Sequence, residues 1–245
     1  MTNERWRTAQ RYEKEYWEKL GERIAARASS QFTWYQWRAD QLIDRLRHLQ
    51  LDQLVDGQAR VIEIGSGPVG LVAYFPAVER VAVDPLENFY AGNKALAALR
   101  NPSVEYRQGA GEQLPCESGR YDLAIIENCI DHVHDVTAVM GELARVLKPQ
   151  GVLYLTVNCR TRWGYLVHRL LSSLRIDAGH PHTFTPTRAK NMLQNGVFRL
   201  LSCEVASYFE ALRGDLQCRS TRARIKALVG VSEFLVTAVA RRSQD

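Results

Sequence analysis

The fold is decided by residues 61–70, which read Val-Ile-Glu-Ile-Gly-Ser-Gly-Pro-Val-Gly. The apolar residues of 61–64 predict a short buried strand, and three glycines follow it within six residues. Glycine lets the backbone turn tightly, and it lets a ligand approach the main-chain N–H groups at the start of the next segment. These residues therefore predict a strand followed by a ligand-binding loop.

Short apolar runs alternate with helical stretches after this loop, which is typical of a parallel α/β sheet. Further strands are expected at 80–84, 104–107, 121–127, 151–158, 198–207 and 233–241. Helices are expected near 69–76, 88–100, 136–148 and 186–195, and an Arg-rich stretch at 209–230 leaves room for a short helix. We therefore predict one α/β domain over residues 58–245.

Residues 1–57 have a helical pattern instead. Apolar residues recur every four positions over 12–24, which predicts a helix over 4–29, and a second helix follows with Trp34 and Trp37 on its apolar stripe. We expect this segment to be a helical extension. Its stripe either packs as ordinary core, which we favour, or covers a ligand as a lid.

Composition excludes several classes of protein. With 245 residues, 46% of them hydrophobic and 24% charged, the chain fits neither a disordered nor a collagen-like protein. Its five cysteines are widely spaced and form no C-x-x-C pair, which argues against a disulfide framework or a zinc ribbon and favours a reducing, cytoplasmic setting. The amino terminus has no apolar signal region, and no apolar run reaches the length of about 18 residues that suggests a membrane span.

Charge is divided unevenly along the chain. Lys and Arg minus Asp and Glu give a balance of −3 for residues 1–159 and +8 for residues 160–245. A basic segment suits an anionic substrate, a nucleic acid or a membrane surface, and it also suits an ordinary solvated face. Nucleic acid is disfavoured, because the basic residues are not interleaved with aromatic side chains that stack on bases.

The glycine loop leaves two enzyme classes open. Gly65, Gly67 and Gly70 form G-x-G-x-x-G, the dinucleotide-binding fingerprint, and Asp84 follows the next strand, where it can accept hydrogen bonds from a ribose diol. This spacing fits an oxidoreductase that uses NAD, and it also fits a methyltransferase that uses S-adenosylmethionine. Glu63 favours the second class, because a carboxylate two residues before the first glycine repels a pyrophosphate and attracts an ammonium or sulfonium group.

Five sequence blocks carry a family resemblance. They are E-I-G-S-G-P-V-G at 63–70, V-D-P-L at 83–86, G-A-G-E-Q-L-P at 109–115, Y-D-L-A-I-I-E-N-C-I-D-H-V at 121–133 and R-V-L-K-P-Q-G-V-L-Y-L at 145–155. In this order they resemble the class I S-adenosylmethionine-dependent methyltransferases. The resemblance implies a Rossmann-like, mostly parallel seven-stranded sheet with an antiparallel last strand and helices on both faces.

The same resemblance implies a set of cofactor-binding residues. The loop with Glu63, Gly65, Ser66, Gly67 and Gly70 would cradle the methionine and ribose parts of S-adenosylmethionine, and Asp84 would hold the ribose. The remaining implied contacts are Leu86, Ala110, Gly111 and Glu112 to the adenine, and Glu127 and Asn128 to the amino-acid part. The sequence departs from the family where Ala110 replaces the usual Asp that bonds the adenine amino group.

Three histidines are candidate catalytic residues. Methyl transfer depends mainly on alignment of the acceptor with the methyl group, and it needs a general base only for a hydroxyl or a protonated amine. His132 follows the fourth predicted strand, and His180 and His182 lie in the segment 159–185, which in this fold covers the acceptor. Each has a structural role as its alternative, and a metal site on the two later histidines is disfavoured because no third ligand is evident.

Arginines at 160, 162, 169 and 175 flank the same covering segment and would suit an anionic or sugar-containing acceptor. We therefore predict methyl transfer from S-adenosylmethionine to an oxygen, or a nitrogen, of a small polar acceptor, with no metal. The alternatives are a cofactor-binding or partner-binding module without turnover and, disfavoured by Glu63, an NAD-dependent oxidoreductase. The acceptor's identity and the oligomeric state do not follow from the sequence.

Overall fold

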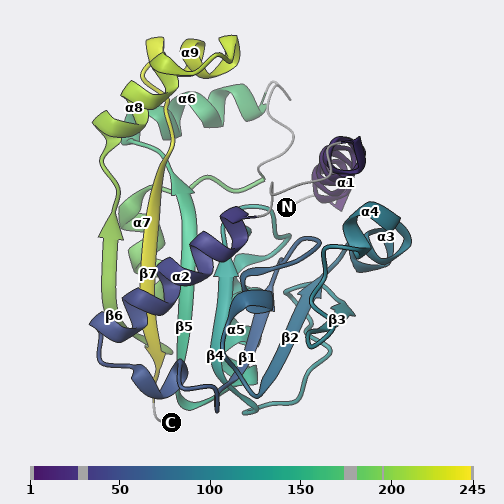
Figure 1. The fold of residues 1–245 in the computed structure, drawn as a ribbon. Coiled ribbons are helices and arrows are strands. Elements are labelled where there is room, and N and C mark those ends of the chain that lie inside the picture. Colours follow the sequence, from purple (N-terminus) through teal and green to yellow (C-terminus); the bar gives the residue numbers. More distant parts are fainter. Residues whose placement is uncertain (1–2, 27–32, 174–180, 195, 244–245) are drawn as a thin grey trace.

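The computed structural model describes residues 3–26, 33–173, 181–194 and 196–243. Its centre is a seven-stranded sheet with the order β3-β2-β1-β4-β5-β7-β6 (Figure 1). The strands are β1 (Arg60–Ile64), β2 (Glu79–Asp84), β3 (Glu105–Gln108), β4 (Tyr121–Glu127), β5 (Leu147–Cys159), β6 (Phe198–Val205) and β7 (Phe234–Arg242). Each agrees with a predicted apolar run to within a few residues.

Strand directions confirm the predicted fold class. β1 pairs in parallel with β2 and β4, with Ile62 opposite both Val81 and Ala124, and the parallel pairing continues to β3 and β5. β7 lies antiparallel between β5 and β6, with Thr237 opposite Thr156. The strand order reverses between β1 and β4, and a sheet of this kind binds ligands beyond the carboxyl ends of its strands at such a point.

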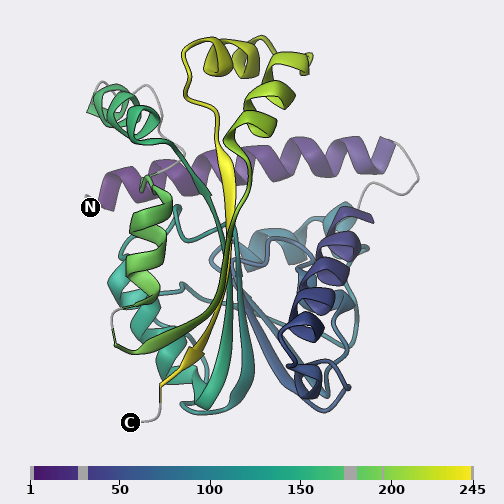
Figure 2. The same cartoon turned by 90° about the vertical axis from the view of Figure 1, so that its left-hand side faces the viewer.

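Helices cover both faces of the sheet (Figure 2). The described helices, some of which lie beyond the strand ends instead, are α1 (Asn3–Ala26), α2 (Thr33–His48), α3 (Glu87–Gly92), α4 (Lys94–Ala97), α5 (Val136–Val146), α6 (Arg162–Ser173), α7 (Pro186–Leu193), α8 (Tyr208–Gln217) and α9 (Thr221–Leu228). One face of the sheet shares a core with α5 and α7, and the other shares a core with α2. Within the described residues, no helix is both long enough and apolar enough to cross a membrane.

The two amino-terminal helices form as predicted, but their buried residues differ from the predicted stripe. Trp34 and Trp37 are exposed, whereas Tyr35 on the same helix is buried. Figure 2 shows that α1 crosses the carboxyl ends of the strands instead of lying along a face of the sheet. Few of its described residues are therefore buried. Trp17 is its buried aromatic side chain, in edge-to-face contact with Tyr90.

Two other predicted helices are interrupted. The segment predicted near 69–76 forms only a short 3₁₀ turn, η2 (Leu71–Tyr74), which begins after Gly70 at φ +78°. The segment predicted near 88–100 divides into α3 and α4 at Asn93, whose side chain accepts hydrogen bonds from two backbone amides of α4. The Arg-rich stretch at 209–230 holds two helices, α8 and α9, in place of one.

Candidate cofactor site

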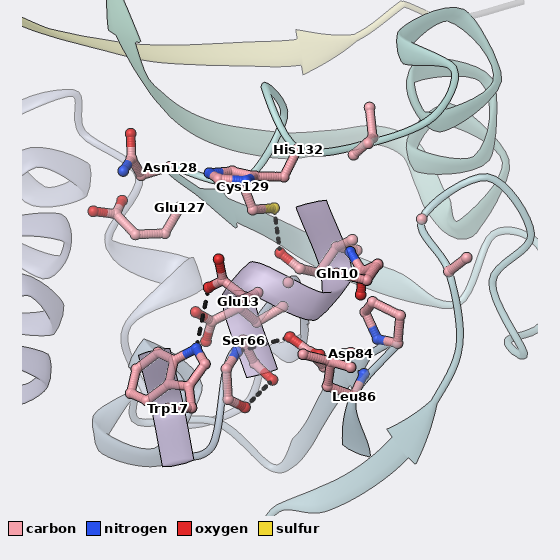
Figure 3. Close-up of a pocket in the computed structure, with 18 of the residues that line it drawn as sticks. Gln10, Glu13, Trp17, Ser66, Asp84, Leu86, Glu127, Asn128, Cys129 and His132 are labelled. Atoms are coloured by element: carbon pink, nitrogen blue, oxygen red, sulfur yellow. Dashed lines mark hydrogen bonds between the residues drawn. The ribbon is translucent and has the colours of Figure 1, made fainter. Parts of the chain in front are cut away.

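A cavity of about 270 Å³ lies beyond the carboxyl ends of β1, β2 and β4. Eleven of the twelve residues predicted to bind the cofactor line it, together with residues of α1 and α2. In Figure 3, Glu127, Asn128 and His132 lie on one side of the cavity, Ser66, Asp84 and Leu86 lie on the other, and side chains of α1 lie between them. The predicted residue that does not line the cavity is Gly70.

The glycine loop needs glycine for two reasons. Gly65 and Gly67 have φ angles of +69° and +60°, a conformation that L-residues with side chains rarely adopt. A Cβ atom at Gly65 would lie 2.3 Å from the Cys129 sulfur, and one at Gly67 would lie 3.0 Å from the Tyr35 hydroxyl and 3.1 Å from the Trp17 ring. The loop is therefore packed between β4 and the two amino-terminal helices.

Asp84 is fixed by the loops beside it. One carboxylate oxygen accepts a hydrogen bond from the Gly67 amide at 2.9 Å, and the other accepts from the Leu86 amide at 2.8 Å. Burial raises the pKa of Asp84 to about 7, against the opposing effect of these two amides. Since each carboxylate oxygen has a second acceptor site, Asp84 can still accept from two ribose hydroxyls.

Glu63 is a buried carboxylate that holds the end of the glycine loop in place. Its Oε2 accepts a hydrogen bond from the Val72 amide at 2.8 Å, and burial raises the pKa of Glu63 to about 7. A Cβ atom at Gly70 would lie 2.6 Å from this same oxygen. Glycine is therefore needed at position 70, because the Glu63 side chain occupies the space that a Cβ atom would take. Glu63 lines the cavity as well, but its bonded oxygen holds the turn that follows the loop.

Glu112 is also engaged by the backbone. Its carboxylate accepts from the amides of His134 and Asp135 at 2.6 and 3.1 Å, so it anchors the segment that leads into α5. Ala110 and Gly111 present the adjacent wall of the cavity. Ala110 offers no side-chain acceptor, so at this position only backbone groups can hydrogen-bond a ligand.

The cavity is strongly acidic. Among its described lining residues are five carboxylates, which are Glu13, Glu63, Asp84, Glu112 and Glu127. Arg38 is the arginine that faces them, and it forms an ion pair with Glu127. A ligand with net positive charge is favoured in such a cavity, whereas the pyrophosphate of NAD would be repelled. The residues present therefore fit S-adenosylmethionine.

Sequence reasoning offered the amino-terminal helices as a lid, but it did not identify the residues that form the roof of the site. Glu13 and Trp17 from α1 and Tyr35 and Arg38 from α2 all line the cavity, and the Trp17 Nε1–H donates to the Glu13 carboxylate at 3.1 Å. A signal for α2 was present, because Tyr35, Arg38 and Leu42 follow helical spacing on one face. Of the two tryptophans singled out from the sequence, Trp34 lines the cavity and Trp37 does not.

The three candidate histidines are placed differently. His132 lines the cavity, and its Nε2 lies 3.9 Å from a carboxylate oxygen of the buried Asp131. The ring of His182 hydrogen-bonds the Val133 carbonyl at 2.9 Å and is not among the cavity-lining residues. Burial lowers the pKa of His182. His180 lies outside the described residues.

The arginines of the covering segment that the structure describes do not line the cavity. Arg160 is buried, pairs with Glu233 at 2.5 Å and donates to the Val231 carbonyl, so it joins β5 to the start of β7. The idea that Arg160 suits an anionic acceptor is therefore wrong, because internal partners occupy it. Arg162 and Arg169 lie exposed on α6, and Arg175 falls outside the described residues.

Comparison with known proteins agrees with this geometry. Residues 62–155 match the model of a methyltransferase domain family. The ubiquinone biosynthesis O-methyltransferase of Bartonella tribocorum is 32% identical over 89 residues, which are 36% of this chain and 36% of that protein. Its counterpart in Bradyrhizobium is 31% identical over 40% of this chain and 39% of its own length. The matched region thus spans well under half of these two relatives.

Solved structures extend the likeness over most of the chain. A candidate sarcosine dimethylglycine methyltransferase from Galdieria sulphuraria has a TM-score of 0.60 at 16% identity, with 84% of this chain and 86% of that chain covered. The Haemonchus contortus phosphoethanolamine N-methyltransferase 2, solved with S-adenosylhomocysteine, has a TM-score of 0.53 at 15% identity, with 81% and 52% covered. At these identities the likeness concerns the fold. Residues 62–155 therefore match a methyltransferase domain, and most of the chain shares its fold with solved methyltransferases.

Proposed function

We propose that this chain transfers a methyl group from S-adenosylmethionine to an oxygen of a small-molecule acceptor. The observation that carries the proposal is the acidic cavity at the strand-order reversal, with Asp84 fixed where a ribose would lie. The relatives named for ubiquinone biosynthesis support oxygen as the acceptor atom. An anionic or sugar-containing acceptor stays a prediction.

Different residues of the cavity would bind different parts of S-adenosylmethionine. Asp84 would accept from the ribose hydroxyls, and Leu86 would pack against the adenine. At the other end, Arg38 would bind the carboxylate of the methionine part, while Glu127 beside it would bind the ammonium. This pairing of opposite charges on the protein matches the pairing of opposite charges on the ligand.

Bound S-adenosylmethionine supplies a methyl group on a positively charged sulfur, ready for in-line displacement. A hydroxyl acceptor would release its proton on taking this methyl group, so a residue of the chain would have to accept that proton. Among the described residues His132 is the histidine that lines the cavity, and we assign it the role of accepting this proton. Asp131 stabilises the resulting imidazolium, since its carboxylate lies 3.9 Å from Nε2.

Aromatic side chains of the roof indicate the shape of the acceptor. Trp6 and Trp34 line the cavity from α1 and α2. Flat apolar walls suit a hydroxylated ring, and the roof also keeps water from the reacting atoms. We therefore favour phenolic acceptors over purely aliphatic ones.

A transfer assay tests this function. The chain is incubated with methyl-labelled S-adenosylmethionine and a panel of phenols, catechols, amines and sugar phosphates, and labelled products are separated by chromatography. The proposal expects label on a phenolic oxygen. Transfer to amines alone would refute oxygen as the acceptor atom, and transfer to sugar phosphates alone would refute the aromatic-wall argument.

A further inference from the structure

Helices α6, α8 and α9 form a cap with an unusually apolar outer surface. On α6, Trp163, Leu166 and Leu170 are 58%, 61% and 65% exposed, and they share one face because they are spaced three and four residues apart. Phe209 on α8 and Leu228 on α9 are 77% and 78% exposed. Exposed apolar residues gathered on one part of a protein mark an interaction surface.

α8 packs against α9, and α6 is linked to the end of α9. The Trp163 Nε1–H of α6 donates to the Val229 carbonyl at 3.0 Å, directly after α9, and Gly230 packs against the same ring. In Figure 1 the three helices lie at one end of the molecule, beyond the ends of β5, β6 and β7, and in Figure 2 α6 lies to one side of α8 and α9. This is the carboxyl-terminal end of the parallel strands, where the cofactor cavity also lies.

The cap is also basic. Over 162–173 and 208–230 there are seven Lys and Arg residues and two acidic residues, a balance of +5, which equals the formal charge of the whole chain. On α6, Arg162 and Arg169 border the apolar face formed by Trp163, Leu166 and Leu170. An apolar stripe containing Trp and Leu, bordered by arginines, is the pattern of a helix that lies in the interface of an anionic membrane.

We propose that the cap docks the chain onto the surface of an anionic phospholipid bilayer. Trp163, Leu166 and Leu170 enter the boundary between headgroups and acyl chains, and the arginines bind lipid phosphates. A second copy of the chain fits this surface less well, because two caps of charge +5 would repel each other. Nucleic acid fits less well too, because most of the exposed apolar side chains are aliphatic and offer no stacking platform.

Vesicle co-sedimentation tests the proposal. Wild-type protein is mixed with vesicles of phosphatidylglycerol and phosphatidylcholine, and separately with vesicles of phosphatidylcholine alone, at low and high salt. We expect binding only to the anionic vesicles, weakened at high salt because the arginine–phosphate attraction is screened. No binding to the anionic vesicles, or equal binding to both kinds, would overturn the proposal.

Two double variants test which residues bind. Leu166→Ser with Leu170→Ser removes exposed apolar surface, and we expect vesicle binding to fall about ten-fold or more. Arg162→Gln with Arg222→Gln removes two charges, and we expect a loss of roughly thirty-fold. Circular dichroism would show whether each variant folds. If the serine variant does not fold, the charge variant still tests the proposal.

Matched controls come from the opposite end of the sheet. Val78→Ser with Val197→Ser changes two exposed apolar residues that precede β2 and β6, and Arg47→Gln with Arg199→Gln removes two charges. Both controls should bind vesicles like the wild type, and equal losses in them would refute the cap as the site. Sedimentation velocity tests whether the cap joins two copies of the chain instead. If the wild type were a dimer and Leu166→Ser with Leu170→Ser were a monomer, the cap would be a dimer interface, and the proposal would be wrong.

Discussion

Arg38 on α2 forms an ion pair with Glu127 at the carboxyl end of β4, directly on the wall of the cofactor cavity. The other oxygen of Glu127 accepts from the Thr156 hydroxyl at 2.8 Å, so the pair is anchored in the sheet. Burial lowers the pKa of Arg38. The amino-terminal extension therefore contributes a charged group to the site and does more than pack against the domain.

Replacement of Arg38 by Gln should weaken binding of S-adenosylhomocysteine about ten-fold or more, because a charge-assisted bond to the ligand's carboxylate is lost. Calorimetry with 5′-methylthioadenosine, which lacks the amino-acid part, should give the same affinity for variant and wild type. Arg47→Gln, an exposed change on the same helix, is the control. Equal weakening toward both ligands would contradict the assignment of Arg38 to the carboxylate.

Gly67→Ala should lower both stability and cofactor affinity. The added Cβ meets the Tyr35 hydroxyl at 3.0 Å and the Trp17 ring at 3.1 Å, so the roof must shift. Gly119→Ala is a close control, because Gly119 has a similar φ of +63° but no atom within 4 Å of the added Cβ. Urea unfolding and calorimetry would compare the two variants. If Gly119→Ala were equally destabilised, backbone strain alone would explain the effect, and packing of the roof on the loop would not.

Stability should depend on pH through the buried carboxylates. Burial raises the pKa of Asp84 and of Glu63 to about 7, above the values near 4 of an unfolded chain. The folded chain then retains protons that the unfolded chain has released, so the free energy of unfolding falls as the pH rises from about 4 to about 7. Above that range this contribution is constant.

Asp84→Asn removes one of these titrations. The decrease in unfolding free energy between pH 5 and pH 8 should therefore be smaller in Asp84→Asn than in the wild type, as measured by urea unfolding without ligand. Asp44→Asn, on the exposed side of α2, should keep the wild-type dependence. The same pH dependence in Asp84→Asn and wild type would show that Asp84 titrates normally in the folded chain.

His132→Ala should reduce methyl transfer to a phenolic acceptor by about 10²–10⁴-fold, the usual contribution of a general base. Its affinity for S-adenosylhomocysteine should change little, since we propose that the histidine acts on the acceptor. In His182→Ala the hydrogen bond to the Val133 carbonyl is lost, so stability should fall while folded protein keeps most of its turnover. The opposite result, with turnover lost only in His182→Ala, would assign the base to His182.

The sheet could be predicted from sequence because its strands are short apolar runs separated by turns. Val61–Ile64 is such a run, and the glycines after it define where the cavity lies. Burial on both faces of a parallel sheet makes this signal local and strong. The positions of Asp84 and Asn128 at strand ends follow from the same logic, since parallel strands bring their carboxyl ends to one edge.

The roof and the covering segment could not be predicted in this way, because their roles depend on distant partners. Trp17 is buried only because α1 crosses the glycine loop, and nothing in its own neighbours distinguishes it from the exposed Tyr16. Arg160 resembled a ligand-binding arginine, but its partner is Glu233, which lies far along the chain, directly before β7. Spacing along a helix predicts which residues share a face, but not what that face meets.

The most direct test of the account is calorimetric titration of the chain, and of Asp84→Asn, with S-adenosylmethionine and with NAD. The account predicts binding of S-adenosylmethionine, no binding of NAD, and a loss of about ten-fold or more in affinity for S-adenosylmethionine in Asp84→Asn, because a buried carboxylate that accepts from ribose hydroxyls is neutralised. Binding of NAD without binding of S-adenosylmethionine would contradict the account.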